Sequence, residues 1–174
     1  MIPRGRVWSA SQARAHDYRG VQQKTVTDSE FWDLIARVDL QALDRGDERG
    51  AVRPVQGELS RKTETELVEF HEALAQKLYA IDGEAYARNA GEAGYSDDGF
   101  LYARLYVVAR GREYYEDIRA HPERMPKSLG QWCEPLLYVH KYAWEALTGR
   151  SASLWPFSPS VSYESGSNPA LWPH

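Results

Sequence analysis

Apolar side chains recur every three or four residues along residues 27–149, which is the spacing of one face of an α-helix. The one run that resembles a strand, residues 106–109, has helical patterns on both sides. The sequence therefore predicts an all-α domain, a compact bundle of about five to six helices. The clearest apolar stripes are Phe31, Leu34, Ile35 and Val38; Leu67, Phe70, His71, Leu74, Leu78 and Ile81; and Trp132, Leu136, Val139, His140, Ala143 and Leu147.

Capping residues mark the expected helix starts. Thr27 with Glu30, and Thr63 with Glu66, each have the spacing of a capping box, in which hydroxyl and carboxylate satisfy free amides of the first turn. Ser96 is a good N-cap, and the two aspartates after it suit the positive end of a helix dipole. We expect helices to begin at these positions.

Proline and glycine mark the weak points and ends. Residues 51–61 can form a helix, although Pro54 weakens it. Gly111 predicts a break or kink in the helical pattern that begins after residue 96. A last helix is expected from about Gln131 to Thr148, with the glycine at position 149 as its stop.

Charge separates the first residues from the rest of the chain. The protein has 21 Lys and Arg against 25 Asp and Glu, a net charge of −4. Residues 1–24 carry five basic residues and one acidic residue, so the remaining 150 residues have a net charge of −8. We interpret residues 1–26 as a basic extended arm and residues 27–149 as the helical domain. The acidic body disfavours nucleic acid as a partner.

Residues 150–174 form a tail rich in serine, proline and tryptophan. Its tripeptide L-W-P at residues 154–156 recurs at residues 171–173. Two exposed tryptophans would be unfavourable in water, so we expect the tail to pack on its own domain or on a partner. A further possibility is that it closes over a pocket as a lid.

Composition is that of one globular domain. The 174 residues are 43% hydrophobic and 26% charged. Cys133 is the single cysteine, which excludes an internal disulfide, and we expect it to be a buried apolar residue. The sequence has no signal-peptide pattern and no apolar run long enough for a membrane span. We therefore expect a cytoplasmic protein with no membrane partner.

Arg104 interrupts the apolar run of residues 96–115. Helical phasing turns it inward, where an unpaired guanidinium would cost several kcal/mol. Asp97 and Asp98 are the local candidates for its partner, and Glu134 is a distant one. The group is either a structural ion pair or, with Arg112, a pocket for an anionic ligand.

His71 and His140 lie on apolar stripes and could face one cavity, where a neutral histidine can act as acid or base. The candidate ligand-binding set is Asp97, Asp98, Arg104, Arg112, His71 and Tyr115. No catalytic residue is assigned. The chain has no zinc-ligand spacing, phosphate-binding glycine loop, dinucleotide fingerprint or serine-nucleophile elbow, so we predict no metal and no cofactor.

Two segments, S-D-D-G-F-L-Y-A-R at residues 96–104 and G-R-E-Y-Y at residues 111–115, resemble the bacterial domain of unknown function 4240, frequent in actinomycetes. The likeness extends to F-W-D-L-I and E-P-L-L-Y-V and covers roughly residues 28–149. It implies a small α-helical domain with no established activity. Where family members often have L-W-x-A-A-Y, this chain has I-D-G-E-A-Y, so a site that used that tryptophan would be altered.

These observations favour a non-enzymatic interaction or regulatory module that binds a protein partner or a small anionic ligand, with a homodimer as one possible assembly. The alternative is a small cofactor-independent enzyme of bacterial specialised metabolism that uses Asp, Arg and His for acid–base chemistry. A weaker alternative is an immunity-type inhibitor of a toxin. An enclosed pocket holding Arg104 and a histidine would favour the enzyme, and a buried, self-paired cluster would favour the module.

Overall fold

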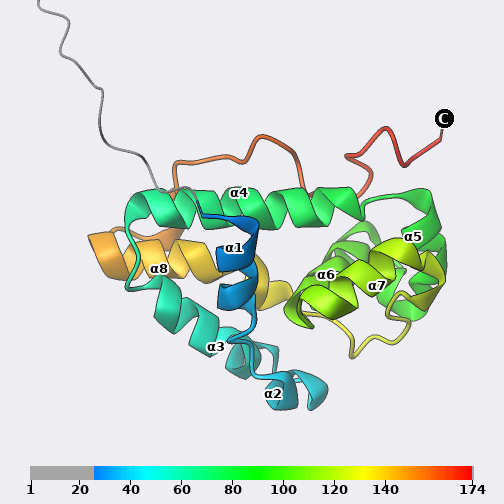
Figure 1. The fold of residues 1–174 in the computed structure, drawn as a ribbon, viewed down its shortest axis with the longest axis horizontal. Coiled ribbons are helices and arrows are strands. Elements are labelled where there is room, and N and C mark those ends of the chain that lie inside the picture. Colours follow the sequence, from blue (N-terminus) through cyan, green and yellow to red (C-terminus); the bar gives the residue numbers. More distant parts are fainter. Residues whose placement is uncertain (1–25, 174) are drawn as a thin grey trace, which may run out of the picture.

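The structure, a computed structural model, describes residues 26–173, which form eight α-helices, four short 3-10 helices and no strand (Figure 1). The α-helices are α1 (Asp28–Ile35), α2 (Leu40–Asp44), α3 (Glu48–Leu59), α4 (Glu64–Ala80), α5 (Glu84–Asn89), α6 (Asp97–Ala109), α7 (Arg112–Ala120) and α8 (Val139–Thr148). The 3-10 helices are η1 (Gly91–Gly94), η2 (Pro122–Arg124), η3 (Glu134–Tyr138) and η4 (Ala152–Leu154). The predicted basic arm lies outside the described residues, except for Val26.

The all-α prediction is confirmed, with more helices than expected. Two of the additional helices are short: α2 has five residues and α5 has six. Gly111 adopts a φ of 95°, a left-handed value that favours glycine, and it separates α6 from α7. No helix formed by residues 26–173 has the length and hydropathy that crossing a membrane requires.

The predicted helix starts are confirmed. Thr27 and Thr63 each form a complete capping box with the glutamate three residues later. The Ser96 hydroxyl accepts a hydrogen bond from the amide of Gly99 at 3.0 Å. These starts follow from contacts between residues close in sequence, which is why the sequence alone predicts them.

Two predicted boundaries were wrong. Helix α3 begins at Glu48 rather than at residue 51, because the Asp47 carboxylate caps it by accepting from the Gly50 amide at 2.9 Å. The last α-helix begins at Val139, and the preceding residues form η3 instead. Pro135 lies at the start of η3, and a proline disfavours the α conformation of the residue before it.

Helix α6 is the buried centre of the domain, with ten of its 13 residues buried. Helix α4 is the longest, at 17 residues, and packs against α1, α6 and α8. In Figure 1 it runs across the domain, and the chain after α8 returns along it towards the C-terminus. Helix α4 and this returning chain are therefore among the neighbours available to a polar side chain that α6 turns inward.

Replacing Thr63 with alanine should lower the free energy of unfolding by about 1 kcal/mol, because the substitution removes the cap of α4. Urea denaturation measures the loss. Thr65→Ala is a matched control, since Thr65 is exposed in the same first turn and should change the value by less than about 0.5 kcal/mol. Equal losses from the two substitutions would contradict the role of the cap.

Candidate functional site

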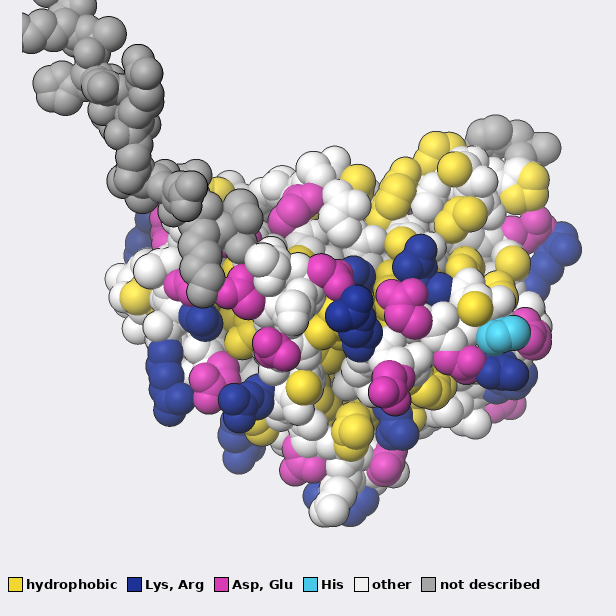
Figure 2. All heavy atoms as spheres, in the orientation of Figure 1, with side chains coloured by type: hydrophobic (Ala, Val, Ile, Leu, Met, Phe, Trp, Pro, Cys, Tyr) yellow, Lys and Arg dark blue, Asp and Glu magenta, His cyan; other side chains and the backbone are white. Residues whose placement is uncertain are grey.

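Residues 150–173, named here the C-terminal segment, lie along α4 (Figure 1). They cover a row of buried polar side chains, from His71 and His140 at one end to Asp82 and Arg104 at the other, which is called the cleft below. The segment has almost no regular structure beyond η4. Figure 2 shows hydrophobic side chains gathered at the upper right, over the region where the segment ends. It contacts the helical domain through hydrogen bonds, several of them to buried groups, and through aromatic rings.

Asp82 is the first of these groups. It directly follows the last buried residue of the α4 stripe, Ile81, and is itself fully buried. Its carboxylate accepts three successive main-chain amides of the segment, from Gly166 at 3.0 Å, Ser167 at 2.7 Å and Asn168 at 3.0 Å. Successive amides that converge on an anion form a nest.

The Gly166 backbone makes this nest possible. Gly166 has a φ of 84°, in the left-handed region that glycine adopts readily. The Asp82 carboxylate also accepts the indole N–H of Trp172 at 3.1 Å. Four donors from the segment therefore compensate one buried negative charge.

Arg104 is the second buried group, and the prediction that it points inward is confirmed by its complete burial. One terminal nitrogen donates to the carbonyl of Leu78 at 3.0 Å. The other donates to the Tyr163 carbonyl at 3.0 Å and to the Ser165 hydroxyl at 3.1 Å. The guanidinium also lies over the Phe100 ring, 4.7 Å from its centroid.

The ion-pair partner of Arg104 is Asp82, at 3.9 Å, so the expectation that Asp97 or Asp98 would fill this role was wrong. Both of those aspartates are exposed in the first turn of α6. Asp97 contributes only its main-chain carbonyl, which accepts the Ser165 hydroxyl at 2.6 Å. Burial lowers the pKa of Arg104 to about 10, against the opposing effect of the Asp82 charge, so the guanidinium remains charged at neutral pH.

The end of α4 explains why these groups gather there. The last carbonyls of a helix lack the usual amide partner four residues later. At this end the carbonyls of residues 78 and 79 accept the amides of Ile81 and Asp82 in the closing turn, at 3.3 and 3.1 Å. Here the carbonyls of residues 77, 78 and 79 accept from Tyr115, Arg104 and Asn168, at 2.8, 3.0 and 2.9 Å respectively. The positive charge of Arg104 also suits the negative end of the helix dipole.

His71 of α4 and His140 of α8 form the other end of the cleft. Their rings stack with centroids 4.1 Å apart and an interplanar angle of 20°. The indole N–H of Trp155, from the C-terminal segment, donates to Nδ1 of His71 at 3.2 Å. Burial lowers the pKa of His71 to about 4 and that of His140 well below its usual value, so both rings are neutral at pH 7.

Tyr163 links the two ends of the cleft. Its ring lies 6.1 Å from the His71 ring, and its carbonyl accepts from Arg104. Of the predicted set, Arg104 and His71 are thus brought beneath one segment. Arg112 is exposed and pairs with Asp28 at 3.4 Å, and Tyr115 is buried with its hydroxyl on a main-chain carbonyl.

The sequence did not identify Asp82 as the partner of Arg104, because the pair Asp82-Gly83 is typical of a helix break. One feature of the sequence could have indicated it. Asp82 directly follows the last apolar residue of the α4 stripe, a position at which a side chain is expected to be buried. The sequence also did not identify the segment residues that bind the cleft, since serines and glycines in a tail carry no periodic signal.

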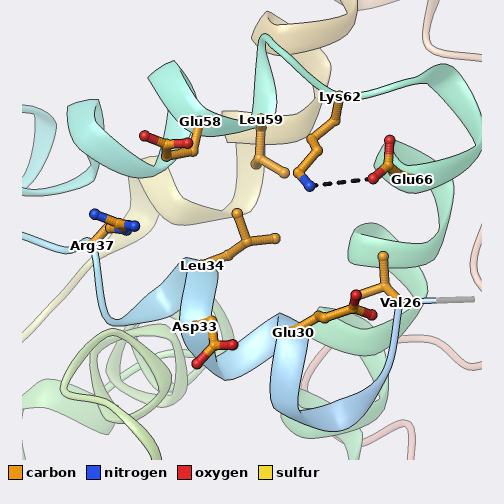
Figure 3. A pocket seen from close by; sticks show the side chains of 9 residues that line it. All are labelled: Val26, Glu30, Asp33, Leu34, Arg37, Glu58, Leu59, Lys62 and Glu66. Atoms are coloured by element: carbon orange, nitrogen blue, oxygen red, sulfur yellow. Dashed lines mark hydrogen bonds and ion pairs between the residues drawn. The ribbon is translucent and has the colours of Figure 1, made fainter.

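Two open pockets lie elsewhere. The smaller, of about 230 Å³, opens between α1, α3 and α4 (Figure 3). The larger is a groove of about 870 Å³ between α3 and the η3–α8 region. Neither is lined by His71, His140 or Arg104. Within residues 26–173 no group of three or more His, Cys, Asp or Glu is placed to hold a metal ion.

The chain belongs to the family described as "Protein of unknown function (DUF4240)", whose model matches residues 26–146 and confirms the resemblance. No curated protein and no solved structure matches the chain. The matched residues include the helical side of the cleft, with His71, Asp82, Arg104 and His140. They end before the C-terminal segment begins.

Arg104→Ala should lower the free energy of unfolding by about 3–5 kcal/mol, because it removes one side of a buried, hydrogen-bonded charge pair. Arg112→Ala is the matched control, because its ion pair is exposed and contributes at most about 1 kcal/mol. Chemical denaturation of both variants gives the comparison. If the two losses were the same, Arg104 would have no structural role.

Stability should fall as the pH drops from about 6.5 to about 4. In this range the unfolded chain protonates His71, whereas the folded chain keeps it neutral, so stability is fully present above pH 6.5. A folded pKa of about 4 corresponds to a loss of about 3 kcal/mol from this residue.

Urea denaturation of the wild type and of His71→Gln at several pH values isolates this effect, since glutamine keeps an acceptor but does not titrate. The wild type should lose more stability than the variant between pH 6.5 and pH 4. Parallel profiles would show that His71 is not held neutral by the fold.

Proposed function

We propose that this protein is a non-enzymatic interaction or regulatory module that binds an extended polypeptide segment of a partner protein in the cleft along α4. In the structure described above, its own C-terminal segment occupies that cleft. One observation carries the proposal: two fully buried charged residues of the helical domain bind the main chain of the segment, Asp82 through three amides and Arg104 through the Tyr163 carbonyl. The bacterial and cytoplasmic setting predicted from the sequence is part of this proposal.

Main-chain recognition is what a peptide-binding cleft requires. A carboxylate that accepts successive amides, and a guanidinium that donates to a carbonyl, fit a backbone of a given shape and tolerate many side chains. Asp82 accepts amides of three residues in a row, and Arg104 binds the Tyr163 carbonyl a few residues earlier. The cleft therefore selects for the direction of the bound chain and for the backbone conformation that brings three successive amides to one carboxylate.

The division of the chain supports the same function. The family match covers the helical side of the cleft, whereas its occupant lies beyond residue 146. A tethered occupant has an effective concentration that reaches the millimolar range for short flexible linkers. A partner segment must therefore compete with the C-terminal segment, which makes the segment a regulator of access.

Ser160 is a point where that access can be controlled. Its amide and its hydroxyl both donate to the Glu72 carboxylate, at 2.7 and 2.5 Å. A negative charge added at Ser160 would face Glu72 and weaken the attachment of the segment.

The alternative is a small cofactor-independent enzyme, and one observation favours it. Nε2 of His71, both ring nitrogens of His140 and Nε of Arg104 are buried without a hydrogen-bond partner. Unpaired polar groups of this kind are available for a substrate if the segment moves away. The module accounts for more of the contacts, because the segment satisfies most of the remaining polar groups.

The proposal is tested on the folded chain by inserting a specific protease site between the exposed residues Arg150 and Ser151. After cleavage, the segment should remain bound at micromolar protein concentration and should exchange with a labelled peptide of residues 151–173. Native mass spectrometry and fluorescence anisotropy report the two events.

Asp82→Asn in the cleaved protein should weaken retention at least tenfold, because the amide replaces a charge that accepts four donors. Asp98→Asn, at an exposed carboxylate, is the control and should leave retention unchanged. Loss of the segment immediately after cleavage, from a domain that stays folded, would refute the proposal. A stable dimer with exchanged segments would identify a second copy as the partner.

A further inference from the structure

Both L-W-P repeats of the C-terminal segment dock in the same manner, at two separate places on the cleft. The indole N–H of Trp155 donates to His71 at 3.2 Å, and that of Trp172 donates to Asp82 at 3.1 Å. His71 lies midway along α4, and Asp82 lies just beyond its C-terminal end. Each acceptor is buried, with an exposed fraction of 4% for His71 and 0% for Asp82.

Aromatic side chains complete each of the two sites. Trp155 meets the His140 ring edge-to-face at 5.0 Å and the Trp144 ring at 5.8 Å. Trp172 meets the Phe100 ring edge-to-face at 6.2 Å. Edge-to-face packing fixes the plane of each indole and directs its N–H towards the acceptor.

From this repeated arrangement we infer that the cleft contains two tryptophan-reading sites, one at His71 and one at Asp82, and that its partner is a protein segment carrying two Trp-Pro motifs. This inference rests on the proposed function and specifies its ligand. Between the two sites the segment binds through main-chain atoms of residues 160, 163 and 166–168 and through the side chains of Ser160, Ser165 and Asn168. The two indoles therefore add an aromatic requirement to these polar contacts.

Hydrogen bonding gives each site its selectivity. A phenylalanine or leucine fills part of the same space but has no N–H to donate, so it leaves a buried acceptor with one donor fewer. Sites built to bind a hydrogen-bonding group reject an analogue that lacks it far more strongly than they reject a change of size. The His71 site depends on this more, because Trp155 is the one donor to the His71 ring among the described contacts.

The proline after each tryptophan contributes to the geometry. Proline has no N–H and restricts the residue before it to an extended conformation. Trp155 has such a conformation, with a φ of −52° and a ψ of 117°. Spacing adds a further requirement, because the two tryptophans are separated by the residues that bind Glu72, Arg104 and Asp82.

The test uses peptides, so the fold of the protein is not altered. Peptides of residues 151–173 with Trp155→Phe, Trp172→Phe or both compete with the labelled wild-type peptide for the cleaved protein. Each single substitution should weaken binding about tenfold, and the double substitution about a hundredfold. Leu154→Ala is the control, because Leu154 is 57% exposed and should change binding less than twofold.

The outcomes separate this inference from the proposed function. If the wild-type peptide binds and both phenylalanine peptides bind within twofold of it, the cleft recognises a chain without reading its tryptophans, and the inference fails alone. If the wild-type peptide does not bind, the proposed function fails with it.

A second measurement uses the intact chain, so it does not depend on how fast the cleaved segment exchanges with the peptide. In the intact chain, Trp172→Phe should increase hydrogen exchange at the amides of residues 166–168, which bind the same carboxylate. Leu171→Ala supplies the comparison within the same motif. Unchanged protection in the Trp172→Phe protein would overturn the role of the indole.

Discussion

The complete burial of Asp82 and Arg104 is the constraint on which the C-terminal part of this structure depends. A charge removed from water is tolerated only when donors or acceptors replace its hydration. The direct ion pair between the two is long, at 3.9 Å, so the hydrogen bonds around each group make the larger contribution. Most of those bonds come from one irregular segment, which therefore has a fixed path although it forms almost no regular structure.

The C-terminal segment contacts helix α4 along the length of the helix. Its side chains at His71 and Glu72 contact the first half of the segment, and its terminal carbonyls and Asp82 contact the second half. A helix end normally leaves carbonyls to be satisfied by water or by a cap. Here buried side chains share that role with the amides of the closing turn, which joins the end of α4, the centre of α6 and the C-terminal segment into one unit.

The two ends of the cleft differ in chemistry. At Asp82 the bound chain meets a negative charge compensated by amides. At His71 it meets a pair of stacked neutral rings, and a neutral imidazole is both an acceptor and an apolar surface. This combination suits a ligand with a polar main chain and large aromatic anchors, and it does not resemble the open, charged pocket expected for a small anionic substrate. Arg112, which the sequence grouped with Arg104, lies on the exposed surface instead.

The sequence by itself determined the helical class, the capped starts of α1, α4 and α6, and the inward direction of Arg104. Each of these follows from side chains within one or two helical turns, where spacing alone decides which groups meet. Only the tertiary structure decided that Arg104 meets Asp82 rather than Asp97, and that the tail residues around Gly166 surround the same carboxylate. Those partners are far apart in sequence, and no local pattern specifies which turn of one helix will pack beside which loop. The packing of α4 against α6 made that choice.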